Sequence, residues 1–175
     1  MLSGSATKLA PCFVGLDKRY VTDVDLRART STGDREGEVV EPHKPASPDQ
    51  LEEWLKGLRG EIELPVPAAS AVKIGGERAY RLHRRGVAVE MPMRRSRVDA
   101  LDVISYSDGV ARLDLRVSSG TYVRAIADAL GGHCATLRRT EVGPFRVEEA
   151  DPERIIAPAD ALARIGVRAE TDAAL

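Results

Sequence analysis

A hydroxyl, a phenol and a guanidinium lie close together in the sequence, on Thr121, Tyr122 and Arg124. Residues 111–117, just before them, alternate between apolar and charged side chains, which is typical of a half-buried strand. Residues 123–130 instead place apolar side chains three and four positions apart, which predicts a helix ended by a glycine pair. Because a strand-to-helix junction directs backbone N–H groups and side chains at a ligand, this stretch is a candidate site that favours anions.

The same residues also allow a purely structural interpretation. Arg124 precedes Asp128 by four positions, so the two side chains could form a surface ion pair that stabilises the helix by a few tenths of a kcal/mol. Tyr122 could simply lie at the half-buried edge of a core. Spacing alone leaves both interpretations open.

Composition places the chain among globular proteins of one ordinary domain. It has 175 residues, of which 30% are charged and 43% hydrophobic. No apolar run approaches the ~20 residues that span a bilayer, and the first residues lack the pattern of a secretory signal. We therefore expect a cytoplasmic protein, with no membrane partner and with reduced thiols at Cys12 and Cys134. The histidines are isolated, so no metal site is predicted.

Positive charge is concentrated in one part of the chain, although the net charge of the whole is −1. Residues 71–97 carry a local charge of +6, and arginine dominates among their cations. Arginine suits bidentate contacts with phosphates, which favours a nucleic-acid partner. The alternative is an ordinary solvated face balanced by nearby acids.

The remaining pattern predicts both strands and helices. Strands are expected at 17–28 and 70–74, with a hairpin joining 97–106 to 110–117 across a Ser-Asp-Gly turn. Ser47 with Pro48 and Gln50 predicts the capped start of a helix whose apolar stripe contains Leu51, Trp54, Leu55 and Leu58. Trp54 could stack on a base, but its place on that stripe favours a core position. A short arginine-rich helix is expected at 77–85.

The predicted fold class is α+β, with a mixed and mostly antiparallel sheet flanked by helices. Neither a G-x-G-x-x-G sequence after a strand nor a P-loop is present, which disfavours a parallel nucleotide-binding fold. We assign residues 1–150 to one partial catalytic domain. Residues 151–175 form a C-terminal helix and tail, in which Asp151-Pro152 caps a helix containing Ile155, Ile156 and Leu162, and the tail frays from Glu170.

Six short stretches follow one another in a distinctive order. They are residues 4–8 (GSATK), 17–20 (DKRY), 30–40 (TSTGDREGEVV), 67–80 (PAASAVKIGGERAY), 119–124 (SGTYVR) and 137–140 (LRRT). Each is weak alone, but together they resemble the bacterial tRNA pseudouridine-55 synthases, the TruB family. The resemblance extends over about residues 4–150.

This resemblance implies isomerisation of uridine to pseudouridine in the T-loop of tRNA, without cofactor or metal. The uracil must leave the stack, be cut from its ribose, rotate and rejoin through carbon, which requires base flipping. Tyr20 would pack against the flipped uracil and Arg124 would pair with the catalytic aspartate. Tyr122 and Leu137 would line the uracil pocket, and Asp34 would support the site. Basic residues of the 73–97 segment would hold T-arm phosphates, namely Lys73, Arg78, Arg81 and Arg85.

Two departures from the family pattern affect the expected activity. The catalytic aspartate of the family lies in a G-x-L-D-x-x-A-T-G segment that this sequence does not contain, and Ser31 replaces the usual acid of the 30–40 loop. We therefore expect an N-terminally truncated synthase that is inactive alone, with a separate N-terminal fragment or self-association through an exposed sheet edge as possible partnerships. The alternative is a non-catalytic module that binds tRNA or another RNA.

Overall fold

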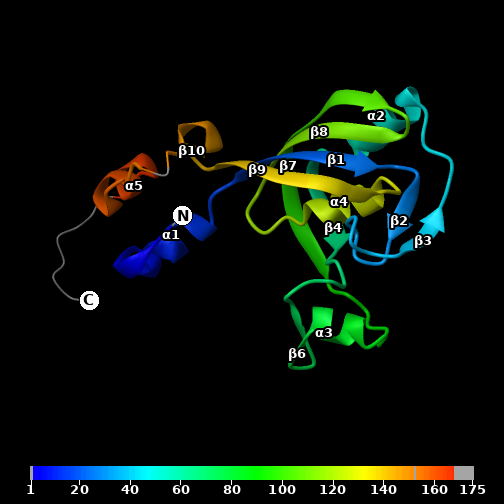
Figure 1. Cartoon of the computed structure of the whole chain (residues 1–175), viewed down its shortest axis with the longest axis horizontal. Helices are drawn as coiled ribbons and strands as arrows, with labels where there is room; N and C mark the ends of the chain where they lie inside the picture. Colours follow the sequence, from blue (N-terminus) through cyan, green and yellow to red (C-terminus); the bar gives the residue numbers. More distant parts are fainter. Residues whose placement is uncertain (1, 152, 168–175) are drawn as a thin grey trace.

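A six-stranded antiparallel sheet organises the protein, of which the computed structural model describes residues 2–151 and 153–167 (Figure 1). The strand order across the sheet is β10-β9-β1-β8-β7-β4. Its strands are β1 (Lys18–Asp25), β4 (Gly60–Pro65), β7 (Met93–Ser107), β8 (Val110–Val117), β9 (His133–Val142) and β10 (Phe145–Arg146). This arrangement confirms the α+β class.

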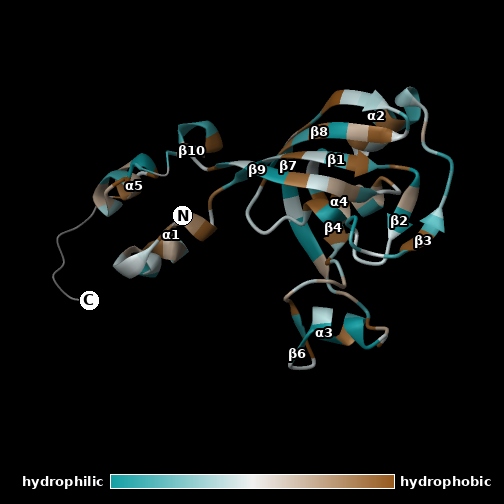
Figure 2. Ribbon diagram, viewed as in Figure 1, coloured by the Kyte–Doolittle hydropathy of each residue, from teal (hydrophilic) through white to brown (hydrophobic). Residues whose placement is uncertain are grey.

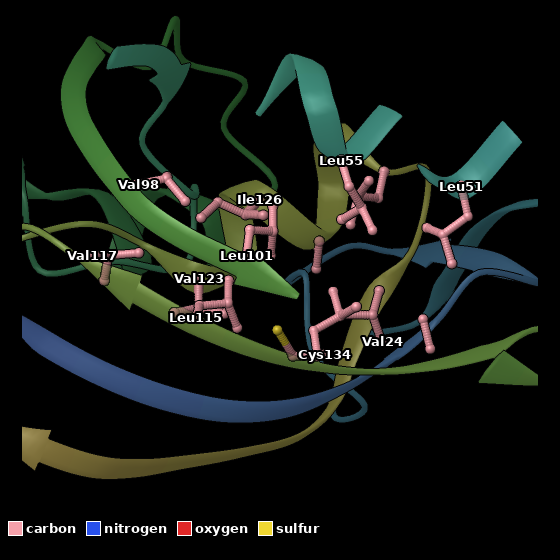
Figure 3. Packing of buried hydrophobic residues seen from close by; sticks show 14 of the residues in the cluster. Val24, Leu51, Leu55, Val98, Leu101, Leu115, Val117, Val123, Ile126 and Cys134 are labelled. Atoms are coloured by element: carbon pink, nitrogen blue, oxygen red, sulfur yellow. The ribbon is translucent and has the colours of Figure 1, made fainter. Parts of the chain in front are cut away.

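One face of the sheet carries the hydrophobic core. Alternate residues of β8 point to this face, and Leu113 and Leu115 are both fully buried. Helices α2 (Pro48–Gly57) and α4 (Val123–Ala129) pack over them, as Figure 3 shows for Leu55 and Ile126. The apolar alternation recognised in the sequence therefore faces the helices, and the alternation of hydropathy along the strands is visible in Figure 2.

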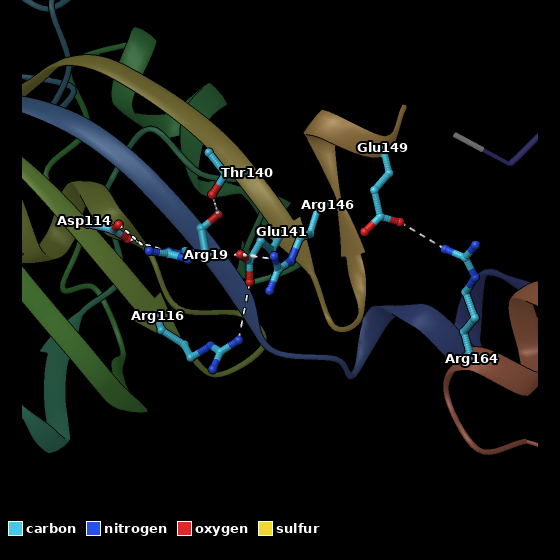
Figure 4. Close-up of polar contacts among 8 residues, drawn as sticks. All are labelled: Arg19, Asp114, Arg116, Thr140, Glu141, Arg146, Glu149 and Arg164. Carbon is cyan, nitrogen blue, oxygen red and sulfur yellow. Dashed lines mark hydrogen bonds and ion pairs between the residues drawn. The ribbon is translucent and has the colours of Figure 1, made fainter. Parts of the chain in front are cut away.

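The opposite face of the sheet is charged. The Glu141 carboxylate is buried there and accepts hydrogen bonds from Arg19 at 3.0 Å and Arg116 at 3.3 Å (Figure 4). Arg19 also donates two bonds to Asp114, at 2.8 and 2.7 Å. Hydrogen bonding to Asp114 and then to Glu141 raises the pKa of Arg19 above its usual value. These contacts join the three central strands β1, β8 and β9 from the side away from the core.

Smaller elements extend from the sheet. Strands β2 (Ala28–Thr30) and β3 (Val39–Pro42) form a ribbon at one end. Residues 66–92 form a projection that we call the finger, built from β5 (Lys73–Ile74), β6 (Glu77–Arg78) and α3 (Ala79–Arg84). Figure 1 shows the finger hanging below the sheet, between β4 and β7. The terminal elements η1 (Gly4–Leu9), α1 (Ala10–Val14), η2 (Val147–Glu149) and α5 (Pro158–Arg164) lie together on another side.

Local signals in the sequence correctly predicted the start of α2 and the turn between β7 and β8. The Ser47 hydroxyl accepts a bond from the Gln50 amide, and the Gln50 side chain accepts one from the Ser47 amide, which is the predicted capping box. The β7–β8 hairpin turns at Asp108 and Gly109, both with positive φ, as a two-residue hairpin loop requires.

The prediction that Trp54 lies in the core is wrong. Its side chain is 44% exposed, because α2 rests on the sheet through Leu51 and Leu55, which are four positions apart. Trp54 lies beside this line of contact rather than on it. An indole that can lean outward buries only part of its area in such a position.

The predicted limits of two helices are also corrected. The last helix begins at Pro158, not near Asp151, and Ile155 is 91% exposed because it precedes the helix and has nothing to pack on. Helix α3 begins at Ala79, since Glu77 and Arg78 pair with Ile74 and Lys73 across the Gly-Gly turn.

Two strands of the sheet were not predicted. β4 follows α2 directly and occupies an edge, where Pro65 is tolerated because one side of the strand needs no partner. β9 is ten residues long, whereas the sequence suggested only a bent strand near Val142. Self-association through an edge of the sheet stays a prediction. The expected fraying from Glu170 concerns residues outside those described. No helix among the described residues is long and apolar enough to cross a membrane.

Replacement of a residue on the core face should be costly. We expect Leu115→Ala to lower the free energy of unfolding by about 2–5 kcal/mol, because Leu115 is fully buried and its loss leaves a cavity. Ile104→Ala, at a position 53% exposed on β7, should cost about 1 kcal/mol or less. Urea unfolding of both variants measures this, and equal losses would contradict the assignment of the two faces.

Candidate active site

Arg124 lies at the centre of the candidate site and joins three segments of the chain. Its Nη1 donates to the Asp34 carboxylate at 2.9 Å and to the Thr32 carbonyl at 3.0 Å. Its Nη2 donates to the Ala69 carbonyl at 2.9 Å. The first turn of α4, the loop between β2 and β3 and the base of the finger therefore meet on one guanidinium, whose side chain is only 22% exposed.

The loop that carries Asp34 is fixed to the sheet as well as to Arg124. The Cys134 amide donates to the Gly33 carbonyl at 3.0 Å, and the Arg35 amide donates to the Cys134 carbonyl at 3.2 Å. The Thr30 hydroxyl closes the loop on the Asp34 carbonyl at 2.7 Å. The orientation of the Asp34 carboxylate is thus set by backbone contacts on both sides of it.

The environment of Asp34 favours its ionised form. Burial alone would raise the pKa of this carboxyl, but several partners outweigh burial and hold the pKa below its usual value. The Thr32 hydroxyl donates to it at 2.6 Å, the Glu36 amide donates at 3.2 Å, and the Arg124 charge adds to both. Asp34 is therefore a fixed anion at neutral pH.

The surface ion pair between Arg124 and Asp128 is not formed, so that interpretation is wrong. Asp128 lies 3.6 Å from Arg29 Nε, on the outer side of α4, while Arg124 points toward the loop. The sequence indicated a supporting role for Asp34 but not its pairing with Arg124. The two residues are 90 positions apart, so no local pattern in the sequence indicates that they pair.

Tyr122 is the N-cap residue of α4 and lines a shallow crevice between the start of α4 and the paired strands β4 and β7. The crevice is also lined by Ile62, Leu64, Pro65, Arg94, Ser96, Thr121 and Ala125. The Arg94 guanidinium carbon lies 6.0 Å from the centroid of the Tyr122 ring. Thr121 turns away from a ligand role, since its hydroxyl donates to the Ser118 carbonyl at 2.9 Å.

Tyr20 and Leu137 lie on the neighbouring strands β1 and β9. Leu137 is paired with Thr22, two positions from Tyr20, and Thr22 points into the core, so all three share the face covered by α4. Leu137 is 47% exposed, and Tyr20 is partly buried against the core. Neither lines the crevice at Tyr122, and neither does Arg124. The convergence of these four side chains on one uracil-sized hollow therefore stays a prediction.

The basic residues of the finger differ in how freely they can meet a ligand. Arg85 forms a salt bridge with Glu77 at 2.8 Å, and Arg78 donates to the Ala71 carbonyl at 3.1 Å. Arg81 and Arg84 both stack on the ring of Tyr80, at 5.9 and 5.7 Å from its centroid. Lys73 is exposed on β5. Sequence reasoning named Lys73, Arg78, Arg81 and Arg85 but missed the shared ring, which presents two cations together.

Within the described part of the chain, no group of three or more His, Cys, Asp or Glu side chains could hold a metal ion. The two cysteines have different environments, since Cys12 is exposed and Cys134 is buried. Burial raises the pKa of the Cys134 thiol, which keeps it protonated beside the loop between β2 and β3.

Comparison with known proteins decides the family. Residues 1–123 match the family model described as TruB family pseudouridylate synthase, N-terminal domain. The chain belongs to this family. It is 42% identical over 159 residues to the tRNA pseudouridine synthase B of Mycobacterium sp. (strain KMS), covering 84% of this chain and 54% of that protein. It is 40% identical over 173 residues to that of Leifsonia xyli subsp. xyli (strain CTCB07), covering 90% and 57% respectively.

The TruB-family chain therefore spans about half the length of the curated relatives it matches. Among solved structures it is similar to a chain of a Cbf5-Nop10-Gar1 complex, with a TM-score of 0.58 and 25% identity over 82% of this chain and 36% of that one. A chain of an H/ACA RNP bound to a substrate RNA shares the fold, with a TM-score of 0.53 and 21% identity, over 82% of this chain and 34% of that one.

The ionised state of Asp34 gives a test by pH. Because its folded-state pKa is lowered, its contribution to stability is present above the unfolded-state pKa of about 3.9 and is lost as pH falls through the folded-state pKa. At neutral pH, Asp34→Asn should therefore be less stable than wild type by about 1–3 kcal/mol. The difference in the free energy of unfolding should shrink as the pH falls to about 3.

Glu36→Gln is the matched control, since it removes a charge from the same loop at an exposed side chain that forms no ion pair among the described residues. Its difference from wild type should be small at every pH. A stability gap for Asp34→Asn that does not change with pH would exclude the ionised pair as its source.

Proposed function

We propose that this chain carries part of the catalytic centre of a tRNA pseudouridine synthase that isomerises uridine 55 of the T-loop. Family membership supports the reaction class, and one observation supports the site: Arg124 is buried to about three quarters and pinned in a single orientation by Asp34, Thr32 and Ala69. An arginine held in this way can align a second carboxylate with little loss of entropy.

The hydrogen bonding of Arg124 leaves room for that second carboxylate. A guanidinium has five N–H donors, and the bonds to Asp34, Thr32 and Ala69 use three of them. The Nε–H and one Nη2–H have no acceptor among the described residues. We assign them to the catalytic aspartate of the family segment G-x-L-D, which the present sequence does not contain. The charge of Arg124 would keep that aspartate ionised.

The other residues act on the flipped uridine. Tyr20 packs its ring against the uracil and assists proton movement at the sugar, and Tyr122 and Leu137 bound the base. Stacking and edge contacts of this kind offset the few kcal/mol that it costs to take a base out of its stack. All steps use protein side chains alone, so no metal or cofactor is assigned.

The finger supplies the RNA contacts in this proposal. Its cations Lys73, Arg78, Arg81 and Arg85 would meet T-arm phosphates, together with the pair stacked on Tyr80. We assign residues 1–150 to the catalytic domain and residues 151–175 to a C-terminal helix and tail. The reaction on tRNA is consistent with a cytoplasmic location.

A non-catalytic RNA-binding role is the alternative. One observation favours it: the exposed cations of the finger do not depend on the catalytic aspartate and lie on a separate projection of the fold (Figure 1). Both functions predict salt-dependent binding of a T-arm stem-loop, so binding alone does not separate them. Release of the uracil 5-hydrogen does, because only the isomerisation replaces it.

The test compares the chain with a chimera in which the N-terminal segment of the Mycobacterium relative, through its G-x-L-D motif, precedes residue 4 of this chain. We expect no tritium release from a 5-³H-uridine T-arm stem-loop with the chain alone, because its sequence does not contain the G-x-L-D aspartate. Asp34 does not replace that aspartate, since its carboxylate is already bonded to Arg124. We expect turnover by the chimera, reduced by at least about 10³-fold in its Arg124→Ala and Tyr20→Phe variants.

Asp128→Asn in the chimera is the control, since it removes a carboxylate from α4 that faces Arg29 and not the site. A folded chimera that binds the RNA without releasing tritium would favour the RNA-binding module. Turnover by the chain alone that is lost on Arg124→Ala would show that the chain is active without a further segment.

A further inference from the structure

Arg94 is a basic residue that the proposed function leaves without a role. It lies on β7 just beyond the finger, where its backbone pairs with Leu64 of β4. Its side chain is exposed and lines the crevice beside Tyr122. The guanidinium carbon is 6.0 Å from the centroid of the Tyr122 ring, within the range of a cation–π contact.

Gly120 makes this position of Arg94 possible. Its φ is +79°, and a Cβ on this residue would clash with Nη2 of Arg94. The glycine of the SGTY stretch is therefore needed twice, for the left-handed turn and for the close approach of the arginine. The three residues Arg94, Gly120 and Tyr122 form one packed unit at the start of α4.

The charge of Arg94 differs from the charges of its neighbours on β7. Arg95 lies 3.8 Å from Glu63, and Arg97 forms ion pairs with Asp99 at 2.7 Å and Asp17 at 3.2 Å. Arg94 has no carboxylate within 4.0 Å among the described residues. Its guanidinium carbon lies over the Tyr122 ring, and its N–H groups donate no hydrogen bond to the described residues, so they remain free to donate to a ligand.

We propose that Arg94 binds a backbone phosphate of the RNA next to the everted nucleotide, and that this contact sets the position of Tyr122 against the base. The inference rests on the proposed function. A planar, delocalised cation can lie on an aromatic ring and donate two parallel hydrogen bonds from its edge to phosphate oxygens at the same time. A lysine ammonium in this place could supply the charge but not the flat contact.

The location explains why a phosphate rather than a base is the ligand. Arg94 stands between the finger, which the proposal places on the T-arm, and Tyr122, which it places on the flipped uracil. A nucleotide that leaves its stack draws its own phosphates toward the pocket, so anionic oxygens must pass this point. With its charge unpaired, Arg94 is suited to receive one of them.

The experiment measures binding of a T-arm stem-loop to the full chain by fluorescence anisotropy over a range of salt concentrations. We expect Arg94→Gln to weaken binding about tenfold and to reduce the slope of log K against log salt by about one. Arg94→Lys should keep the salt slope while recovering only part of the affinity. Arg95→Gln is the matched control, since it removes the neighbouring charge from the other side of β7.

A neutral linkage identifies the phosphate. The phosphates on the 5′ and 3′ sides of the target uridine are replaced, one at a time, by an uncharged methylphosphonate. The adjoining sugar is 2′-deoxy in these RNAs and also in the phosphodiester controls. At one position the substitution should weaken binding by wild type and by Arg95→Gln, yet cause no further loss in Arg94→Gln. A purely structural role of Arg94 would leave the losses additive at every position.

Gly120→Ala gives a second variant, which places a Cβ against Nη2 of Arg94 and also strains the left-handed turn, so it should weaken binding at least as much as Arg94→Gln. Binding by Gly120→Ala that is as tight as that of wild type would overturn the proposal. Absence of RNA binding by the wild-type chain would instead count against the proposed function, whereas wild-type binding that Arg94→Gln leaves unchanged would overturn only this inference.

Discussion

The arrangement of the site depends on a single guanidinium that ties α4, the loop between β2 and β3 and the base of the finger together. These segments are far apart in the sequence, and although the loop is also bonded to β9 through Cys134, the loop and the base of the finger both meet α4 at this guanidinium. Arg124 joins them by hydrogen bonds to one carboxylate and two carbonyls. Unlike hydrophobic contacts, these bonds are directional. The positions of Asp34 and the finger are therefore coupled to the first turn of α4.

The two faces of the sheet are held by different physics. On the helix side, burial of leucine and valine from β1, β7 and β8 provides most of the stabilisation and little directional information. On the other side, arginines around the buried Glu141 lock the register of three strands through ion pairs. Removal of one partner would leave the buried Glu141 carboxylate without a compensating charge. An intact buried ion pair adds little net stability, so these residues mainly specify the alignment of the strands.

The sequence predicted what depends on neighbouring residues and missed what depends on distant ones. The alternation in β8, the Ser47 cap and the Asp108–Gly109 turn follow from local rules and are confirmed. The exposure of Trp54, the edge strand β4 and the contact of Arg94 with Tyr122 depend on which surfaces meet after folding. Motif order identified the family, but only the coordinates connected Arg124 to Asp34, ninety residues away.

The fifteen-residue strand β7 gives the molecule a mechanical property. It leaves the finger at Met93 and runs the length of the sheet, and its early part is bonded to the turn that leads into Tyr122 through the Ser118 amide and the Arg97 carbonyl. The finger and that turn are therefore both attached to the first half of β7. This hydrogen bond fixes the turn before Tyr122 to the same strand that continues from the finger, so the two lie at a set distance along one strand.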